Sequence, residues 1–99
     1  MTSKKRKQLM REAHHLHPTV MVGKHGVTPS VTEELRENLE LRELVKIKFV
    51  DYKDEKQELF HYLCRETQAE EVQIIGNIGV AYKRQEDPEK RKYHGIPAE

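Results

Sequence analysis

The stretch Val20-Met21-Val22-Gly23-Lys24-His25-Gly26-Val27-Thr28-Pro29-Ser30 is the part of the sequence around which the rest is organised. A short apolar run stops at a glycine, two polar residues follow, and a second glycine leads into the start of a helix. Glycine reaches backbone angles closed to other residues, and it lets another chain approach closely. The first N–H groups of a helix point outward, and the helix dipole favours negative charge there. This strand–loop–helix unit therefore suits phosphate.

The Gly-x-x-G pattern is weak evidence when it stands alone. Such a loop clamps the nucleic-acid backbone in KH-type RNA-binding modules, but an ordinary strand-to-helix turn has the same pattern. The chain also holds a second copy, Gly76-Asn77-Ile78-Gly79, between two apolar runs. Because Gly-Asn is a favoured two-residue hairpin turn, we predict a purely structural role for this second copy.

Length and composition predict one small domain with its own core, since the chain has 99 residues of which 35% are hydrophobic. No apolar run approaches the length that spans a bilayer, and the basic N-terminus lacks the apolar stretch of a signal peptide. A single cysteine, Cys64, excludes an internal disulfide and fits a reducing compartment. We therefore expect a cytoplasmic protein that is not bound to a membrane.

The net charge of +1 hides a strong segregation along the chain. Residues 1–28 carry six lysines and arginines against one acidic residue, residues 31–71 carry seven against twelve, and residues 83–92 carry five against three. Histidines add hydrogen-bond donors to the first block: His14, His15, His17 and His25. The basic ends indicate that a polyanion can bind one side of the molecule.

The N-terminal block predicts a helix over about Lys4–His15, capped by Thr2 or Ser3 and ended by Pro18. Spacings of three and four place four apolar residues on one side of it: Leu9, Met10, Ala13 and Leu16. Four cations lie largely off this stripe and are expected to face outward: Lys4, Lys5, Lys7 and Arg11. They form either a surface for phosphate or an ordinary solvated helix face.

The middle of the chain alternates between strands and helices. Residues 19–22 read as a short buried strand. The following helix is capped either by Ser30, with Glu33 completing a capping box, or by Thr28, with Pro29 as the first helical residue. Leu44–Val50 alternates as a half-buried strand. Asp54, with Gln57 three residues later, is expected to cap a third helix. The inner face of this helix is expected to hold Leu59, Leu63 and either Tyr62 or Cys64.

The last regular elements are two strands, Val72–Ile75 and Ile78–Tyr82, joined by the Gly76-Asn77 turn. The order helix-strand-helix-strand-helix-strand-strand predicts an α/β fold, in which a small mixed four-stranded sheet packs with three helices. The domain is expected to cover residues 1–84, and residues 85–99 to form a charged, flexible C-terminal tail.

Several segments carry a resemblance to one known family. They are Ala13-His14-His15-Leu16-His17-Pro18 after the basic helix, Val22-Gly23-Lys24-His25-Gly26-Val27-Thr28, Leu44-Val45-Lys46-Ile47-Lys48, Arg65-Glu66-Thr67, Val72-Gln73-Ile74-Ile75-Gly76 and Val80-Ala81-Tyr82-Lys83-Arg84. Together they resemble the CRM domain, named for chloroplast RNA splicing and ribosome maturation, in its stand-alone bacterial YhbY-type form. Val27 stands where the family usually has leucine, which is a mild apolar change.

The resemblance implies an RNA-binding module whose Gly23–Gly26 loop contacts RNA. For the bacterial stand-alone form it also implies association with precursors of the large ribosomal subunit. We expect a monomer that binds large-subunit ribosomal RNA or a pre-ribosomal particle. The candidate RNA-binding residues are Gly23, Lys24, His25, Gly26 and Thr28 around the loop, and Lys4, Lys5, Lys7, Arg11, His14 and His15 in the first helix.

Other classes of function fit the sequence less well. Histidines bunched at one helix end rarely converge on a zinc ion, and no cysteine lies near them in the sequence to complete a set. No serine, cysteine or lysine has recognisable partners for covalent catalysis, and Cys64 is expected in the core. We therefore expect neither an enzyme nor a metal or other cofactor.

One alternative partner remains at this stage. The acidic middle helices would suit a protein-interaction module that docks a basic ribosomal protein. Duplex DNA is not expected, because the sequence has no helix–turn–helix or other groove-reading signature.

Overall fold

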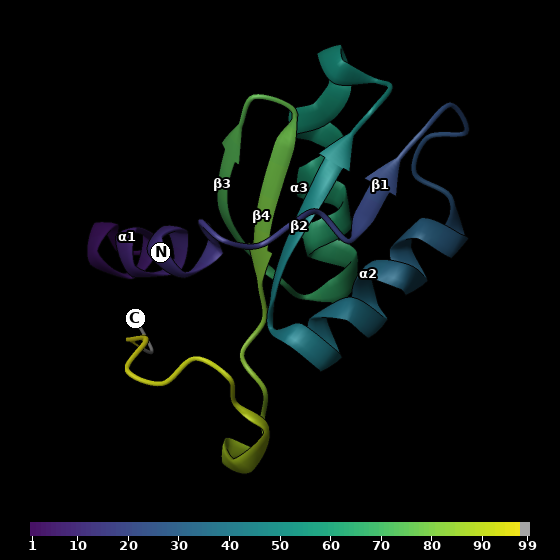
Figure 1. Cartoon of the computed structure of the whole chain (residues 1–99). Helices are drawn as coiled ribbons and strands as arrows, with labels where there is room; N and C mark the ends of the chain where they lie inside the picture. Colours follow the sequence, from purple (N-terminus) through teal and green to yellow (C-terminus); the bar gives the residue numbers. More distant parts are fainter. Residues whose placement is uncertain (98–99) are drawn as a thin grey trace.

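Three helices and a four-stranded mixed sheet follow one another in the predicted order (Figure 1). The structure is a computed structural model that describes residues 1–97. Its elements are α1 (Ser3–Ala13), β1 (Val20–Val22), α2 (Pro29–Arg42), β2 (Leu44–Phe49), the 3-10 turn η1 (Lys53–Glu55), α3 (Lys56–Thr67), β3 (Glu70–Ile75), β4 (Ile78–Tyr82) and the 3-10 turn η2 (Pro88–Lys90). None of the helices in this described part is long and apolar enough to cross a membrane.

The sheet has the strand order β1-β2-β4-β3. β1 and β2 pair in parallel across the α2 crossover, as expected for a strand–helix–strand unit. β4 is antiparallel to both β2 and β3. β2 and β3 therefore run in the same direction but are not neighbours, because the β3–β4 hairpin inserts β4 between them. Gly76 takes a left-handed backbone (φ 58°) in the hairpin turn, which confirms the predicted turn.

Two predicted helix caps can be compared with the structure. Thr28 caps α2 by accepting a hydrogen bond from the N–H of Val31, so the second of the two expected starts is correct and the Ser30 capping box is wrong. The expected Asp54 cap of α3 is also wrong. Asp54 lies inside the 3-10 turn η1, and Glu55 occupies the cap position without a side-chain hydrogen bond.

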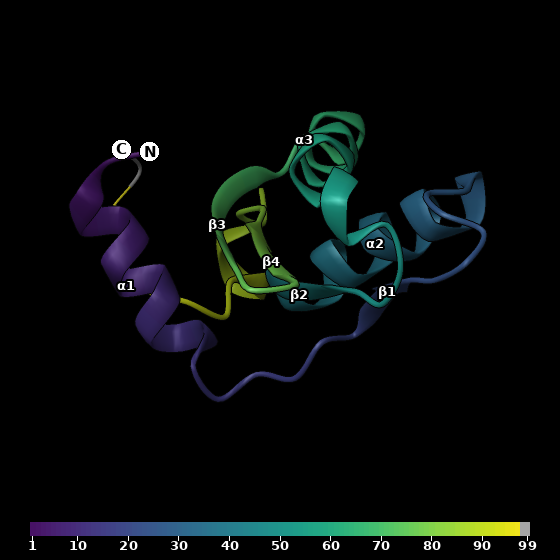
Figure 2. The same ribbon diagram turned by 90° about the horizontal axis from the view of Figure 1, so that it is seen from above.

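α2 and α3 cover one face of the sheet (Figure 2). Their apolar stripes meet alternate strand residues in the main core, which contains Val20, Val22, Leu35, Leu39, Val45, Ile47, Phe49, Phe60, Leu63, Cys64 and Ala81. α3 turns Cys64 inward and leaves Tyr62 exposed, which decides between the two expected inner residues. This layer is the larger part of the core, and β1 and β2, which precede and flank the loop after β1, both pack into it.

α1 packs on the opposite face of the sheet, over the half formed by β3 and β4. This smaller core contains Leu9, Ala13, Leu44, Val72, Val80 and Tyr82. β3 starts two residues earlier than predicted, and a bulge between Glu71 and Gln73 leaves Val72 out of the strand pairing. Val72 is buried in this smaller core, and its carbonyl accepts a hydrogen bond from Arg6 Nε at 2.8 Å.

The segment after β4 contacts the domain. Tyr93 and Ile96 pack against the smaller core. The buried carboxylate of Glu43 accepts hydrogen bonds from the backbone N–H groups of Gln85 (2.7 Å) and Lys92 (2.5 Å). These contacts were not predicted, and they oppose free movement of the segment. The domain boundary at residue 84 and the flexibility of the tail remain predictions, and residues 98–99 of that tail lie outside the described part.

Candidate nucleic-acid interface

A tight turn connects β1 to the start of α2. The N–H of Gly26 donates a hydrogen bond to the carbonyl of Gly23 at 2.9 Å, which closes a four-residue turn with Lys24 and His25 at its tip. Both tip residues are exposed. Gly26 has φ 71°, a left-handed conformation that costs other residues free energy, so the fold itself favours a glycine here. We call residues 23–26 the Gly loop.

Gly23 differs from Gly26 in that the fold does not require it. Its backbone is not left-handed, and a Cβ atom added to it would meet no atom of the described chain within 4 Å. Nothing packed inside the protein therefore excludes a side chain at this position. The missing side chain leaves open space directly beside Lys24, where a second chain can come close to the backbone.

The N-terminus of α2 follows the Gly loop after Val27. Thr28 is half-buried, and its Oγ1 accepts from the N–H of Val31 at 3.2 Å, while its carbonyl accepts from the N–H of Thr32 at 3.1 Å. Thr28, a predicted RNA contact, thus has a structural role as the helix cap. The positive end of the helix dipole lies next to Lys24 and His25 and adds to their attraction for an anion.

Tyr52 supports the Gly loop and was missed in the sequence. Its hydroxyl donates to the carbonyl of Lys24 at 2.9 Å, and its ring lies 3.5 Å from where a Cβ of Gly26 would be. Because β1 and β2 are parallel, residues that follow β2 come to the same edge of the sheet as residues that follow β1. Strand–helix–strand units favour parallel pairing, so an aromatic residue just after the second strand was the available signal.

The other predicted contacts lie in α1 or directly after it, and five of the six side chains face solvent: Lys4, Lys7, Arg11, His14 and His15. The predicted helix end at His15 is wrong, because α1 ends at Ala13 and both histidines follow it. The expectation that Lys5 faces outward is wrong. Lys5 is 3% exposed, and its Nζ lies 2.9 Å from a carboxylate oxygen of Glu70. Positions 5, 9 and 13 share one side of a helix, so Lys5 follows Leu9 and Ala13 onto the sheet. Its apolar stem packs there while its ammonium group reaches Glu70.

The Gly loop and α1 lie at opposite sides of the molecule. Figure 2 shows α1 beyond β3 at one side of the sheet and the loop after β1 at the other. The longest extent of the molecule is 37 Å. The structure therefore does not gather the predicted residues into one compact site. An RNA that contacts both regions has to cross the sheet, where β2 carries Lys46 and Lys48.

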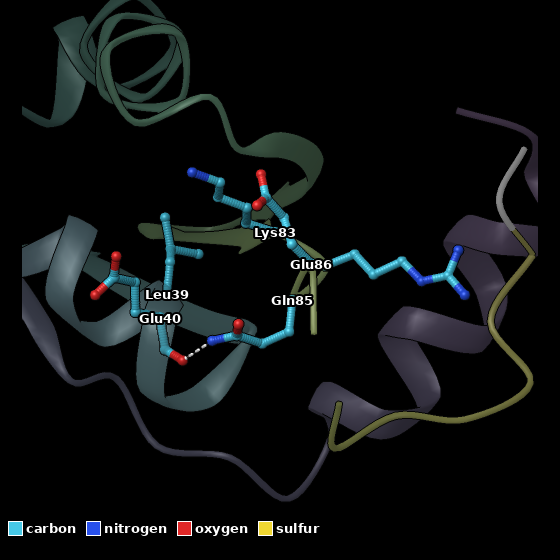
Figure 3. A pocket seen from close by; sticks show the side chains of 6 residues that line it. Leu39, Glu40, Lys83, Gln85 and Glu86 are labelled. Atoms are coloured by element: carbon cyan, nitrogen blue, oxygen red, sulfur yellow. Dashed lines mark hydrogen bonds between the residues drawn. The ribbon is translucent and has the colours of Figure 1, made fainter. Parts of the chain in front are cut away.

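A pocket of about 200 Å³ lies between the C-terminal half of α2 and residues 83–86 (Figure 3). Side chains of both charges line it, the cations of Lys83 and Arg84 and the carboxylates of Glu40 and Glu86. The side-chain amide of Gln85 donates to the carbonyl of Glu40 across it. This mixture of charges does not favour an anion, so the pocket is not part of the candidate interface.

The titratable side chains give little support for catalysis. The thiol of Cys64 is buried, and its pKa is raised to about 12, first by burial and second by the Glu71 carboxylate. It therefore stays protonated and is a poor nucleophile. The rings of His14 and His15 meet edge to face with centroids 5.2 Å apart. Within residues 1–97, no group of three histidine, cysteine or acidic side chains is arranged to hold a metal ion.

Comparison with known families decides how this arrangement is classified. The model of the CRS1/YhbY (CRM) domain matches residues 1–83, which is most of the chain. The chain belongs to the CRS1/YhbY (CRM) family. This result confirms the resemblance found in the sequence, and the matched range includes α1, the Gly loop and all four strands of the CRM domain.

Individual relatives carry names that refer to RNA. A Haemophilus influenzae protein named "RNA-binding protein" is 40% identical over 87 residues, which are 86% of this chain and 88% of the relative. A Bacillus subtilis protein named "Probable RNA-binding protein YqeI" is 34% identical over 88 residues, covering 88% of this chain and 92% of the relative.

A solved structure has the same fold as this CRM domain. The solution structure of a Staphylococcus aureus hypothetical protein, described as "a putative RNA binding protein", matches with a TM-score of 0.79 and 30% identity. The match covers 98% of this chain and 99% of the other. The predicted α/β fold is thereby confirmed by a second molecule.

Proposed function

We propose that this CRM domain binds RNA, holding the sugar–phosphate backbone at the Gly loop and along the exposed cations of α1. The observation that carries the proposal is Gly23, a glycine without a role in the fold that sits beside two exposed donors, Lys24 and His25. The missing side chain at this position allows the backbone of another molecule to come close to the turn. The names of the relatives support RNA as that partner.

The charge distribution suits the same ligand. The cations of residues 1–28 that remain exposed lie on α1 and the Gly loop, while the acidic residues of α2 lie on the other face of the sheet from α1. A polyanion laid along the face that carries α1 meets attractive charge at both ends. Lys5 is not part of this surface, because its ammonium group forms an ion pair with Glu70.

The finer part of the proposal concerns the biological RNA. The bacterial stand-alone members that the sequence resembles associate with precursors of the large ribosomal subunit. We extend this to the present chain as an assembly role on precursor large subunits, carried out by a monomer in the cytoplasm. Crosslinking the protein in cells and sequencing the attached RNA tests it, with enrichment of large-subunit ribosomal RNA as the expected result.

No catalytic step belongs to this proposal. The protonated thiol of Cys64 lies in the core between the sheet and α3, away from both basic regions. Binding alone, through charge and backbone approach, accounts for the exposed residues of the interface.

A second candidate function is docking of a basic ribosomal protein. The observation that favours it is the outer side of α2, where four carboxylates are exposed: Glu33, Glu34, Glu37 and Glu40. Treatment of cell extracts with nuclease separates the two functions. Ribosome association that survives complete RNA digestion supports the protein contact, and association that is lost supports RNA.

The decisive experiment reverses the charge of the Gly loop with the double substitution Lys24→Asp and His25→Asp. Both residues are exposed, so we expect a change in unfolding free energy of only about 0.5 kcal/mol. RNA affinity should fall at least about tenfold, which is about 1.4 kcal/mol, because attraction to phosphate becomes repulsion. Titration with labelled RNA and thermal melting measure the two effects.

The matched control is Asn77→Asp in the second Gly-x-x-G segment. Aspartate is tolerated in turns, and it keeps the oxygen that accepts from Lys56 Nζ at 3.3 Å. RNA binding of this variant should stay close to that of the parent. The proposal fails if the control loses as much affinity as the loop variant, or if the loop variant binds normally.

Salt dependence gives an independent test of the same proposal. If roughly four to six phosphates are neutralised, the slope of log affinity against log salt should be roughly −3 to −4 for single-stranded RNA. Titrations at several salt concentrations measure it. A slope near zero would exclude the electrostatic contact.

A further inference from the structure

Four residues form a row across the sheet, near the end at which β1, β2 and β3 finish and β4 begins. Met21 pairs with Lys48, Lys48 pairs with Ile78, and Ile78 pairs with Ile75. Residues that pair directly across strands project from the same face of a sheet. Their neighbours along the strands, Val22, Ile47 and Ile74, pack into the core below α2 and α3. The row therefore lies on the other face, and we call these four residues the sheet row.

The sheet row is uncovered. Met21 is 56% exposed and Ile75 is 54% exposed, Lys48 is exposed, and Ile78 is half-buried. The remainder of this face is occupied by α1 and by residues 14–19, which cross β4 and β2 on the way to β1 (Figure 1). Lys46 Nζ donates to the carbonyl of Leu16 at 3.0 Å at this crossing. Apolar side chains thus stay in water at one end of a face that is covered elsewhere.

The charge of this face is positive. Lys46 and Lys48 both project from it, two residues apart on the same side of β2. The carboxylates of β3 are engaged away from the row: Glu70 pairs with Lys5 below α1, and Glu71 contacts His61 of α3. Among the paired strand positions of the described chain, none that surrounds the row on this face is acidic. An anionic partner with apolar surfaces fits this combination.

The sheet row is continuous with the Gly loop. Met21 precedes Gly23 by two residues of extended chain, which is a separation of about 7 Å. Tyr52, 43% exposed, lies against the loop on the same edge of the sheet. Across the sheet, three strand spacings place Met21 and Ile75 roughly 14 Å apart. A nucleic-acid strand whose backbone is held at the Gly loop can therefore reach the row with adjoining nucleotides.

We infer that the sheet row binds the bases of a single-stranded RNA segment whose backbone is held at the Gly loop. The inference rests on the proposed function and adds the kind of RNA that is recognised. Unpaired bases expose apolar faces, which Met21, Ile75 and Ile78 can cover, and Lys48 lies within the row to neutralise a phosphate. A duplex hides these faces inside its stack, so the row selects single strands. Other four-stranded sheets bind two or three unstacked bases across their open face.

The test uses the full chain with two probes, a ten-nucleotide oligouridylate and an abasic ribose-phosphate oligomer of the same length. The double variant Met21→Ser/Ile75→Ser should lose affinity for oligouridylate by about tenfold, within the range of base-stacking losses. Its affinity for the abasic oligomer and its salt slope should match the parent. Lys48→Gln should weaken both probes and flatten the salt slope by about 0.7.

The control is Leu41→Ser, because Leu41 is a 69% exposed apolar residue at the end of α2, outside the row. This variant should bind both probes as the parent does. On the parent itself, oligouridylate should shift the methyl NMR signals of Met21, Ile75 and Ile78 and leave those of Leu41 unchanged. This measurement does not depend on the stability of any variant.

Several results would overturn the inference. If the double variant binds oligouridylate like the parent, the row does not contact bases. The same conclusion follows if the double variant loses equal affinity for both probes. A parent that is a dimer in sedimentation, with a monomeric double variant of unchanged RNA affinity, would assign the row to a second copy of the chain.

Failure of the inference is distinguishable from failure of the proposed function. If Lys24→Asp/His25→Asp loses affinity for both probes while Met21→Ser/Ile75→Ser loses none, the proposed backbone contact at the Gly loop is supported and the inference about the sheet row is wrong. If the loop variant binds normally while the row variant loses affinity for oligouridylate, the proposed backbone contact at the Gly loop is wrong, and of the inference only the contact between the row and the bases is supported.

Discussion

The two Gly-x-x-G segments, Gly23–Gly26 and Gly76–Gly79, differ in what surrounds their glycines. Each has one glycine in a left-handed turn, Gly26 with φ 71° and Gly76 with φ 58°. The remaining glycines are opposites. A Cβ on Gly79 would lie 2.6 Å from a ring carbon of Phe60, whereas a Cβ on Gly23 would meet no described atom within 4 Å. Folding thus accounts for both glycines of the second segment and for one of the first.

Three of the residues between the glycines, Asn77, Lys24 and His25, follow the same division, whereas Ile78 belongs to the sheet row. Asn77 is half-buried, with its carbonyl accepting from the N–H of Phe49 at 2.8 Å and its side chain accepting from Lys56. The side chains of Lys24 and His25 are exposed, and it is the carbonyl of Lys24 that Tyr52 holds. A motif is a good candidate for binding where its residue types are not explained by folding. This criterion separates the two copies when their sequences cannot.

The largest effect should come from Gly79→Ala, which tests the structural assignment of the second segment. The new methyl group would press into the ring of Phe60 in the main core. Overpacking of this kind costs about 2 kcal/mol, which lowers the melting temperature by roughly 10 °C in a domain of this size. Thermal melting followed by circular dichroism measures it. A melting temperature equal to that of the parent would mean that Phe60 moves aside freely.

The next effect comes from the two left-handed glycines, compared as a pair. Gly26→Ala and Gly76→Ala should each cost about 1 kcal/mol, because alanine is strained at positive φ. The stability loss should therefore be similar. RNA affinity should fall for Gly26→Ala and stay unchanged for Gly76→Ala. Equal losses of affinity in the two variants would remove the functional difference between the segments.

Much of the fold followed from local patterns in the sequence. Leu35 and Leu39 recur on one side of α2, the strand residues alternate, and Gly76-Asn77 marks the hairpin turn. These signals act over a few residues, so they survive without knowledge of the tertiary structure. The Gly loop could be placed for the same reason, because the strand before it and the helix after it are both locally encoded.

The features that were missed depend on contacts between distant parts of the chain. In the sequence Lys5 resembles its exposed neighbours, but in the fold its ammonium group donates to the carboxylate of Glu70, 65 residues later. Glu43 resembles the solvated acids of α2, yet it is buried, has φ 65° and accepts hydrogen bonds from the C-terminal segment. The separation of α1 from the Gly loop likewise depends on which face of the sheet α1 covers. Helix periodicity does not contain that information.

Gly23→Ala sharpens the comparison at the position that folding leaves unexplained. The methyl group would enter open space, so the free energy of unfolding should change by no more than about 0.5 kcal/mol from that of the parent. RNA affinity should drop roughly fivefold, about 1 kcal/mol, because the methyl group holds the phosphate backbone away from the turn. RNA titration beside a thermal melt gives both values. Unchanged affinity would show that the open space at Gly23 is not used.

The smallest effect should come from Tyr52→Phe, which asks whether the Gly loop is held in shape from outside the motif. The substitution deletes the hydrogen bond from the Tyr52 hydroxyl to the carbonyl of Lys24 and keeps the ring against Gly26. One exposed hydrogen bond contributes about 0.5 kcal/mol, so the melting temperature should fall by only a few degrees. RNA affinity should fall roughly twofold, because a looser turn must be ordered on binding.

Tyr62→Phe is the matched control for that prediction, since Tyr62 is a similarly exposed tyrosine on α3, away from the loop. It should leave RNA affinity unchanged. If both tyrosine variants bind like the parent, the turn is already fixed by the hydrogen bond between Gly26 and Gly23, and Tyr52 only packs against it. If Tyr52→Phe alone weakens binding, the shape of the Gly loop depends on the parallel pairing of β1 and β2 that brings Tyr52 beside it. The second Gly-x-x-G segment, inside an antiparallel hairpin, is held instead by Lys56 Nζ, which donates to the carbonyl of Gly76 at 2.6 Å, and by the N–H of Phe49, which donates to the carbonyl of Asn77.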